Sequence, residues 1–494
     1  MTTETIHAPK ALRYRPGEIN VAAEDPFEND RLGREPFIKA TSDLLKAIQE
    51  PFVIALNGPW GSGKTTTLRM LEPYLATAGV TTVRFNAWEV DYATDPLIPL
   101  VAELHDRLLS IKGYGPSFDH AKVDRLKALG SVIAKHGAIA AVKIATAGFF
   151  DLGAAAEGIA KATGEAAEEA SEAFAVDLID VFKQERQAAQ QFRSLLLELT
   201  ACVRVPSSDG IEPPPLVLII DELDRCRPTF AVAMLERIKH FFDVPGLVFV
   251  LALDLKQLNA SIRKVYGTEF DATEYLRRFV DLELRLPRAS VSDMVEAMLS
   301  DCGADTFFDA RKGHPELRKD REWIVEVIKS LALYFELTPR LVQRMISRLM
   351  LVVRQTSADH YLDPIIVVFL IFLRFHDEGL LRDLIAGRAH ASHVMEKLRT
   401  VRPQGQLFYD SHVGMLIEAY LLYAHYDEHT YVAEFVERVQ ELDGQNVDAA
   451  SRRMLEVARR YEGVRSASVW RGRIDLRRID ERITLVATDL KAEG

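Results

Sequence analysis

Eight consecutive residues, 58–65 (GPWGSGKT), fit the pattern G-x-x-x-x-G-K-[ST]. Glycines allow backbone N–H groups to converge on phosphate oxygens, and the dipole of a following helix favours the same negative charge. Lys64 is expected to bridge the β- and γ-phosphates, and the Thr65 hydroxyl to coordinate Mg²⁺. A glycine turn that binds nothing is the alternative. The pattern predicts phosphate contacts from Gly58, Trp60, Gly61, Ser62, Gly63, Lys64, Thr65 and Thr66.

A second motif follows the apolar run at residues 216–220, where Asp221 and Glu222 are adjacent. Asp221 is expected to hold Mg²⁺ through water, and Glu222 to orient and polarise an attacking water. The alternative is a surface turn with solvated carboxylates, which the upstream phosphate loop argues against. Asp224 and Arg225 either pair with each other or face the nucleotide. Together the two motifs indicate binding of Mg²⁺ and a nucleoside triphosphate.

The elements that position these motifs follow from hydrophobic patterning. Short apolar runs typical of buried strands occupy residues 52–57, 80–87, 216–220, 247–253 and 280–286. Helical patterns occupy residues 36–49, 64–76 and 96–109. This alternation predicts a parallel α/β sheet, with the phosphate loop between the first strand and its helix.

Three further regions surround the predicted sheet. Residues 1–29 form a polar arm, residues 30–290 the α/β domain and residues 291–494 an all-α region. No simple crossover needs the length of residues 112–205, so this stretch is predicted to be a helical insertion. An amphipathic helical hairpin fits it, either simply packed or serving as an oligomer contact, a partner site or a membrane-surface element.

Composition limits the class of protein. The chain has 494 residues, 48% of them hydrophobic, and 61 Lys and Arg against 72 Asp and Glu give a net charge of −11. A general nucleic-acid coat is therefore disfavoured. Three cysteines without paired spacing suit a reducing compartment and offer no structural zinc site. With neither a signal peptide nor 18 uninterrupted apolar residues, a cytoplasmic location and no transmembrane span are expected.

At these motifs the sequence resembles the KAP family of P-loop NTPases. The phosphate loop, the acidic pair within IDELDRCRP (220–228) and five shorter signatures occur in the order of that family over about residues 25–350. The shorter signatures are DRLGR (30–34), FNAW (85–88), VLALD (250–254), YLRR (275–278) and LTPR (337–340). The resemblance implies a P-loop sheet with an additional strand and a catalytic glutamate, and hydrolysis of ATP.

The resemblance also implies roles for residues outside the two motifs. Asp254 would sense the γ-phosphate or water, although a helix N-cap is nearly as good an interpretation. Either Arg277 or Arg278 would be an arginine finger, and Arg278 is the preferred candidate. The alternative is that both arginines form ordinary surface ion pairs. Arg340 would be a sensor in the helical region. Leu32 and Gly33 would lie near the adenine.

The predicted function is an ATPase whose hydrolysis drives a conformational or assembly switch, with a homo-oligomer or an effector protein as partner. The phage-exclusion member of the family extends this prediction, by analogy, to bacterial antiviral defence. Two alternatives stay open. One is a nucleotide-dependent scaffold with little turnover. The other is a nucleic-acid-stimulated ATPase, because ten arginines stand against five acidic residues between Arg452 and Arg482.

Overall fold

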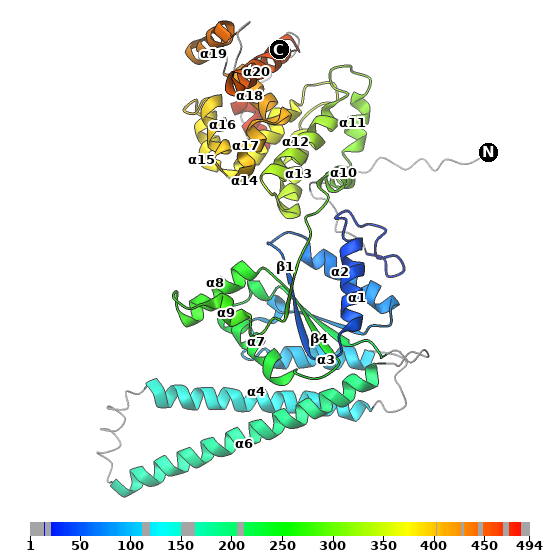
Figure 1. Cartoon of the computed structure of the whole chain (residues 1–494), viewed down its shortest axis with the longest axis vertical. Helices are drawn as coiled ribbons and strands as arrows, with labels where there is room; N and C mark the ends of the chain where they lie inside the picture. Colours follow the sequence, from blue (N-terminus) through cyan, green and yellow to red (C-terminus); the bar gives the residue numbers. More distant parts are fainter. Residues whose placement is uncertain are drawn as a thin grey trace, which may run out of the picture.

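The computed structural model describes residues 14, 21–110, 119–149, 164–204, 212–401, 403–425, 429–442, 448–467 and 474–485. These residues form an elongated molecule with three tiers. A helical hairpin lies at one end, an α/β sheet in the middle and a helical region at the other end (Figure 1). The arm expected over residues 1–29 lies mostly outside the described residues. The domain boundaries drawn from the sequence stay predictions.

Five strands form one parallel sheet in the order β2-β3-β4-β1-β5. They are β1 (Phe52–Asn57), β2 (Thr82–Asn86), β3 (Leu216–Asp221), β4 (Leu247–Leu253) and β5 (Leu282–Arg285). Each coincides with one of the predicted runs. β4 separates β1 from β3, so the additional strand implied by the resemblance is present. Because the strands are parallel, their carboxyl ends meet at one edge of the sheet, where ligands bind in such folds.

Helices cover both faces of the sheet (Figure 1). One face packs against α1 (Glu35–Ala47) and α2 (Lys64–Thr77). The other packs against α3 (Leu97–Ser110), α7 (Pro228–Phe241) and α8 (Leu255–Tyr266). In β3, Val217 and Ile219 join the first core, whereas Leu218 and Ile220 join the second. This alternation follows from the two-residue period of a strand, and burial on both faces explains the continuous apolar run.

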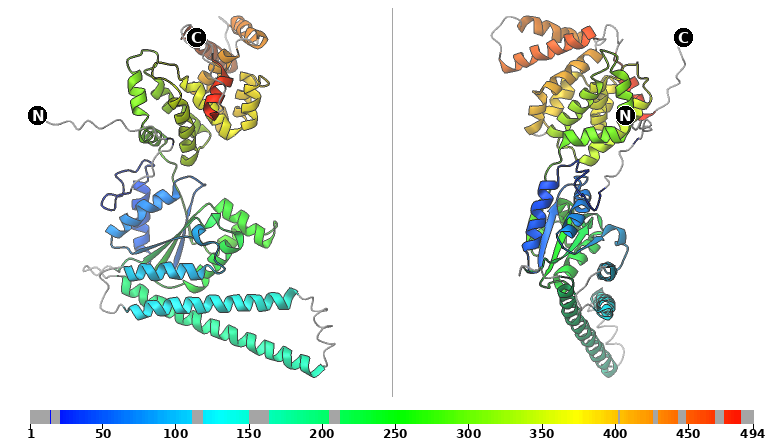
Figure 2. Two further views of the ribbon diagram at one scale, coloured as in Figure 1. Left: turned by 180° about the vertical axis from the view of Figure 1, so that it is seen from behind. Right: turned by 90° about the vertical axis from the view of Figure 1, so that its right-hand side faces the viewer.

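The predicted insertion contains α4 (His120–Phe149) and α6 (Gly164–Val203), which pack against each other as a hairpin that projects from the sheet (Figure 2). Its base is anchored by buried side chains such as Val123, Leu126 and Phe192, which belong to the core of the sheet. The side chains of Lys135, His136 and Lys143, and all of Asp151, lie outside the described residues. Among the residues that are described, no helix has the length and apolar character needed to cross a membrane.

The short helix α9 (Ala272–Leu276) precedes β5, and the elements that the described residues form after β5 are all helices. They are α10 (Val291–Asp301), α11 (Asp305–Arg311), α12 (Asp320–Tyr334), α13 (Pro339–Arg354), α14 (Pro364–His376), α15 (Glu378–Ile385), α16 (Ala391–Arg399), α17 (Pro403–Tyr409), α18 (His412–Ala424), α19 (His429–Leu442), α20 (Ala449–Ala467) and α21 (Leu476–Thr484). The all-α region predicted from the sequence is therefore present.

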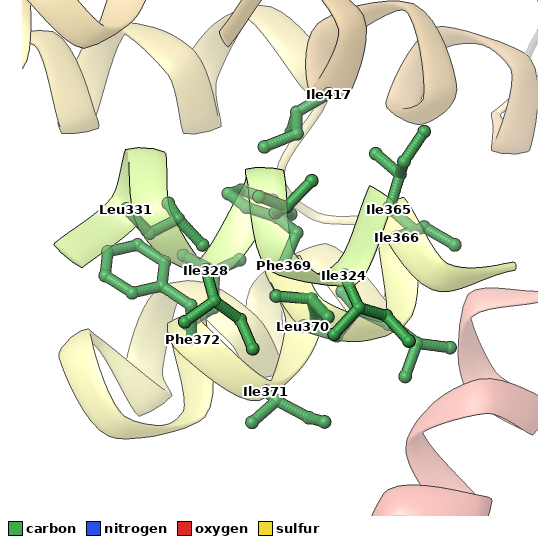
Figure 3. Close-up of a cluster of buried hydrophobic side chains, with 14 of the residues drawn as sticks. Ile324, Ile328, Leu331, Ile365, Ile366, Phe369, Leu370, Ile371, Phe372 and Ile417 are labelled. Carbon is green, nitrogen blue, oxygen red and sulfur yellow. The ribbon is translucent and has the colours of Figure 1, made fainter. Parts of the chain in front are cut away.

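The centre of this helical region is α14, whose residues from Pro364 to Leu373 are all buried. Figure 3 shows side chains of α12, such as Ile328, and of α14, such as Phe369 and Phe372, in one apolar cluster with Ile417 of α18. A helix that is apolar on every side must be surrounded by other helices. This explains why the most apolar run of the sequence is a core helix.

Candidate nucleotide-binding site

The loop at residues 58–63 connects β1 to α2 at the carboxyl edge of the sheet. Gly61 and Gly63 have φ angles of 78° and 94°, which L side chains rarely adopt. A Cβ at Gly61 would lie 2.5 Å from Cβ of Arg340, and one at Gly63 would lie 2.6 Å from Cδ1 of Leu32. Only glycine therefore fits at both positions, because both the backbone conformation and the available space exclude a side chain.

Lys64 begins α2 and is buried. Its Nζ donates to the carbonyl oxygens of Gly58 at 2.6 Å and Pro59 at 3.4 Å. Burial lowers the pKa of Lys64, and the negative charges of Asp224, Asp254 and Asp221 oppose that shift. The fold has thus brought the lysine of one motif close to the carboxylates of the other.

Two features of the loop suit it to bind a phosphate. The Ser62 hydroxyl is buried and has no hydrogen-bond partner among the residues that the structure describes. The half-buried Thr65 and Thr66 lie in the first turn of α2, where backbone N–H groups have no partner within the helix and favour an anion. The donors of this loop therefore match a phosphate, and the role of Thr65 in holding a metal ion stays a prediction.

Asp221 ends β3 with its side chain only 2% exposed. Its Oδ2 accepts a hydrogen bond at 3.0 Å from Nη2 of Arg84, and its Oδ1 accepts one at 3.0 Å from the Glu222 backbone N–H. Arg84 lies on β2 and also donates to Glu72 of α2. A cationic group thus contacts the carboxylate predicted to face Mg²⁺.

Glu222 follows directly with a φ of 62° and a side chain that is 15% exposed. Its Oε1 lies 2.6 Å from Nη1 of Arg225, and its Oε2 lies 3.5 Å from Nδ2 of Asn86 at the end of β2. Arg225 in turn covers the ring of Trp88 at 5.4 Å. The carboxylate predicted to polarise water is therefore held by an arginine and an asparagine.

The pairing of Asp224 with Arg225, one of two alternatives from the sequence, is wrong. Asp224 Oδ2 instead accepts hydrogen bonds from Trp60 Nε1 at 2.6 Å and from the Asp254 backbone N–H at 3.0 Å. Burial raises the pKa of Asp224, against the attraction of Lys64. Asp224 thus joins the phosphate loop to the end of β4.

Asp254 caps α8: its side chain accepts from the Lys256 backbone N–H at 3.0 Å. The N-cap interpretation is therefore what the geometry shows, and the sensor role stays a prediction. Its position after β4, beside Asp224, keeps it at the same edge of the sheet as the acidic pair.

The three arginines named from the resemblance occupy different environments. Arg340 lies at the start of α13, where its backbone N–H donates to the Gly61 carbonyl at 3.2 Å. Arg277 and Arg278 follow α9 and are exposed, and Arg277 pairs with Glu274 at 2.9 Å. Arg340 is thus next to the phosphate loop, whereas the finger role of Arg278 stays a prediction.

Leu32 is buried over Gly63, while Gly33 is exposed and has a φ of 64°. Sequence reasoning gave no role to Arg84, which contacts Asp221, or to Arg34, which contacts the Ser62 carbonyl. A signal did exist for Arg84, because a charged residue inside the apolar run 80–87 needs a partner.

The parallel sheet, the glycine loop before α2 and the acidic pair after β3 define a P-loop NTPase with an additional strand. The chain belongs to the KAP family: the model of the KAP family P-loop domain matches residues 34–356, more than half of the chain. Lys64, Asp221, Glu222, Asp254 and Arg340 all lie inside the match, as does Arg278, whereas Leu32 and Gly33 precede it. Nucleotide binding is the property that this class shares.

Two solved structures of the Aeropyrum pernix ORC2 protein show a much weaker likeness. The form with ADPNP and ADP has 11% identity and a TM-score of 0.27, covering 94% of this chain and 98% of its own. The ADP form has 12% identity and a TM-score of 0.24, covering 82% and 86%. No curated protein matches the sequence.

Proposed function

We propose that the protein hydrolyses ATP with Mg²⁺, and that binding and hydrolysis change the contact between its sheet and its helical region. The observation that carries this proposal is the position of Glu222. It follows β3 at the sheet edge where Lys64, Asp221 and Asp254 also lie. A protein that only binds nucleotide has no need of a carboxylate there.

In this proposal, Thr65 and Asp221 hold Mg²⁺, which when bound neutralises phosphate charge. Lys64 exchanges the Gly58 carbonyl for the β- and γ-phosphate oxygens, because an ammonium favours an anion over a neutral carbonyl. Glu222 accepts a proton from water while the water oxygen bonds to the γ-phosphorus and the bond from that phosphorus to the β-phosphate oxygen breaks, which releases ADP. For this step Glu222 must leave Arg225, since a carboxylate already neutralised by an ion pair is a weaker base.

The ion pairs at Asp221 and Glu222 also keep the first alternative open. If neither carboxylate is released when nucleotide binds, the protein is a nucleotide-dependent scaffold with little turnover. We favour turnover because the Arg225–Glu222 pair is partly exposed, and pairs of this kind hold their partners weakly.

The second alternative, stimulation by nucleic acid, receives less support. Arginines between Arg452 and Arg482 are engaged within the helical region. Ion pairs with glutamates are made by Arg453, Arg459, Arg460, Arg465 and Arg477. Trp470, Arg471 and Arg473 lie outside the described residues. Paired guanidinium groups have less capacity to displace counterions from phosphates.

The partner remains a hypothesis. The exposure of Arg278 supports a finger that acts across a contact between copies of the chain, and the projecting hairpin offers a surface for an oligomer or an effector protein. A role in bacterial antiviral defence rests on the family resemblance alone, and a cytoplasmic location rests on the sequence alone.

The test is steady-state ATP hydrolysis with Mg²⁺ by the wild type and by Glu222→Gln, with nucleotide binding measured in parallel. Glu437→Gln, an exposed position on α19, is the matched control. We expect turnover by the wild type and the control, and binding without turnover by Glu222→Gln. If all three bind and none hydrolyses, even with DNA or RNA added, the scaffold alternative replaces the ATPase.

A further inference from the structure

Three consecutive residues of the phosphate loop contact parts of the chain far from it in sequence. The Gly61 carbonyl accepts from the Arg340 N–H, the Ser62 carbonyl accepts from Arg34, and Gly63 lies under Leu32. The carbonyl side of the loop is therefore an internal interface, whereas nucleotide phosphates bind to the N–H side of such loops.

Two of these contacts come from a short strap, residues 30–34, that lies between the sheet and the helical region. Leu32 belongs to the buried core of the helical region while it touches Gly63. Arg31 makes a two-point ion pair with Asp301 at the end of α10, with one contact at 3.1 Å. The Ser290 N–H at the start of α10 donates to the Leu32 carbonyl at 3.4 Å. The strap is thus fixed to α10.

Arg34 completes the connection from inside the protein. Its side chain is fully buried, and its guanidinium donates to the Ser62 carbonyl at 3.0 Å and to the Pro287 carbonyl. Pro287 lies between β5 and α10, in the segment that joins the sheet to the helical region. Asp30 steadies the strap by accepting from the backbone N–H groups of Leu32, Arg34 and Glu35.

The contact at Ser62 has a consequence for phosphate binding. The Ser62 carbonyl and the Gly63 N–H belong to one trans peptide unit, so they point in opposite directions. A guanidinium that holds the Ser62 carbonyl on its own side turns the Gly63 N–H to the opposite side of the loop, where it can donate to a phosphate. It also keeps a partial negative charge away from the phosphate.

We infer that Arg34 is a positioning residue for nucleotide binding, which fixes the Ser62–Gly63 peptide and ties it to the linker at Pro287. Nucleotide binding and the position of the helical region then both depend on the buried guanidinium of Arg34. In this inference Arg34 acts through the Ser62–Gly63 peptide and not by contact with a phosphate. The inference rests on nucleotide binding but not on hydrolysis.

The test compares Arg34→Met and Arg34→Lys with the wild type by measuring ADP affinity calorimetrically. Arg31→Met is the matched control, because it removes a cation of the same strap that pairs with Asp301 and not with the loop. We expect Arg34→Met to raise the Kd for ADP by about tenfold or more, because the Ser62 carbonyl loses its charged hydrogen-bond donor. Lysine should restore part of the affinity, and Arg31→Met should bind like the wild type.

Hydrogen exchange supplies a readout that general destabilisation would not move. In the wild type, ADP should protect both the loop at residues 61–64 and the linker at residues 286–290. In Arg34→Lys at saturating ADP, the loop should be protected from exchange but the linker should not. Because this measurement needs only the lysine variant, it tests the inference even if Arg34→Met does not fold. Wild-type affinity and linker protection in both Arg34 variants would overturn the inference and leave nucleotide binding intact. If the wild type binds neither ADP nor ATP, both proposals fail.

Discussion

The sheet edge and the helical core both contain buried charges, but they hold them differently. At the sheet edge, Asp221 and Glu222 each contact one arginine, and the Glu222 pair is partly exposed. In the helical core, Arg311 donates to Asp320 from two nitrogens and to two backbone carbonyls, with both side chains almost fully buried. The first arrangement can exchange partners when a ligand binds, whereas the second stabilises one structure.

The largest effect is expected in the core. Arg311→Met leaves Asp320 buried without its cation, which should lower the local free energy of unfolding by ~3–5 kcal/mol. Hydrogen exchange of the α12 amides measures this loss. Arg277→Met, which breaks the exposed pair with Glu274, is the control and should leave stability unchanged. If both substitutions lowered the free energy of unfolding equally, the buried Arg311–Asp320 ion pair would stabilise the structure no more than an exposed ion pair does.

The next prediction tests the contact between the two regions. Gly61→Ala places a methyl group against Arg340 at a positive φ, so it should cost roughly 1–2 kcal/mol in backbone strain. It should also weaken ADP binding, because the loop or α13 must move. Gly79→Ala shares the positive φ but meets nothing within 4 Å. Calorimetric titration should therefore show reduced ADP affinity only for Gly61→Ala. If Gly79→Ala reduced the affinity as well, the effect at Gly61 would not depend on its contact with Arg340.

A smaller effect is expected at the exchangeable pair. Arg225→Met should raise ATP turnover at saturating ATP by up to about fivefold, because a partly exposed pair holds its carboxylate with ~1 kcal/mol or less. Arg227→Met removes the same charge two residues away and should leave turnover unchanged. A fall in turnover for Arg225→Met would mean that Arg225 assists the reaction instead of restraining Glu222.

The smallest effect concerns pH. Burial raises the pKa of Asp224 above its ordinary value of 3.8. Such a carboxyl group contributes stability below that ordinary value, and the contribution is lost as pH rises through the raised pKa. Asp224→Asn keeps an acceptor for Trp60 but does not titrate. The wild type should therefore lose Tm relative to Asp224→Asn as pH rises above about 4 in thermal unfolding. Parallel curves would contradict the raised pKa.

Local patterns were sufficient to predict much of this protein. The five runs predicted as strands, the helix after the glycine loop and the all-α region after β5 are present because period and turn chemistry act over a few residues. The same holds for the two motifs: Asp221 ends β3 and Glu222 follows it, while Lys64 begins α2 directly after the glycine loop. The length and the helical patterning of residues 112–205 also predicted the long insertion.

What only the tertiary structure decided is the set of partners around those motifs. Arg225 pairs with Glu222 and not with Asp224, Arg84 reaches Asp221 from β2, and Arg34 joins the Ser62 and Pro287 carbonyls. Sequence fixes which residues can ionise or donate, since that chemistry belongs to each residue. Which carboxylate or carbonyl lies nearby depends on strand order and domain contact, because these bring Arg84 to Asp221 and Arg34 to Pro287 across more than a hundred residues of sequence.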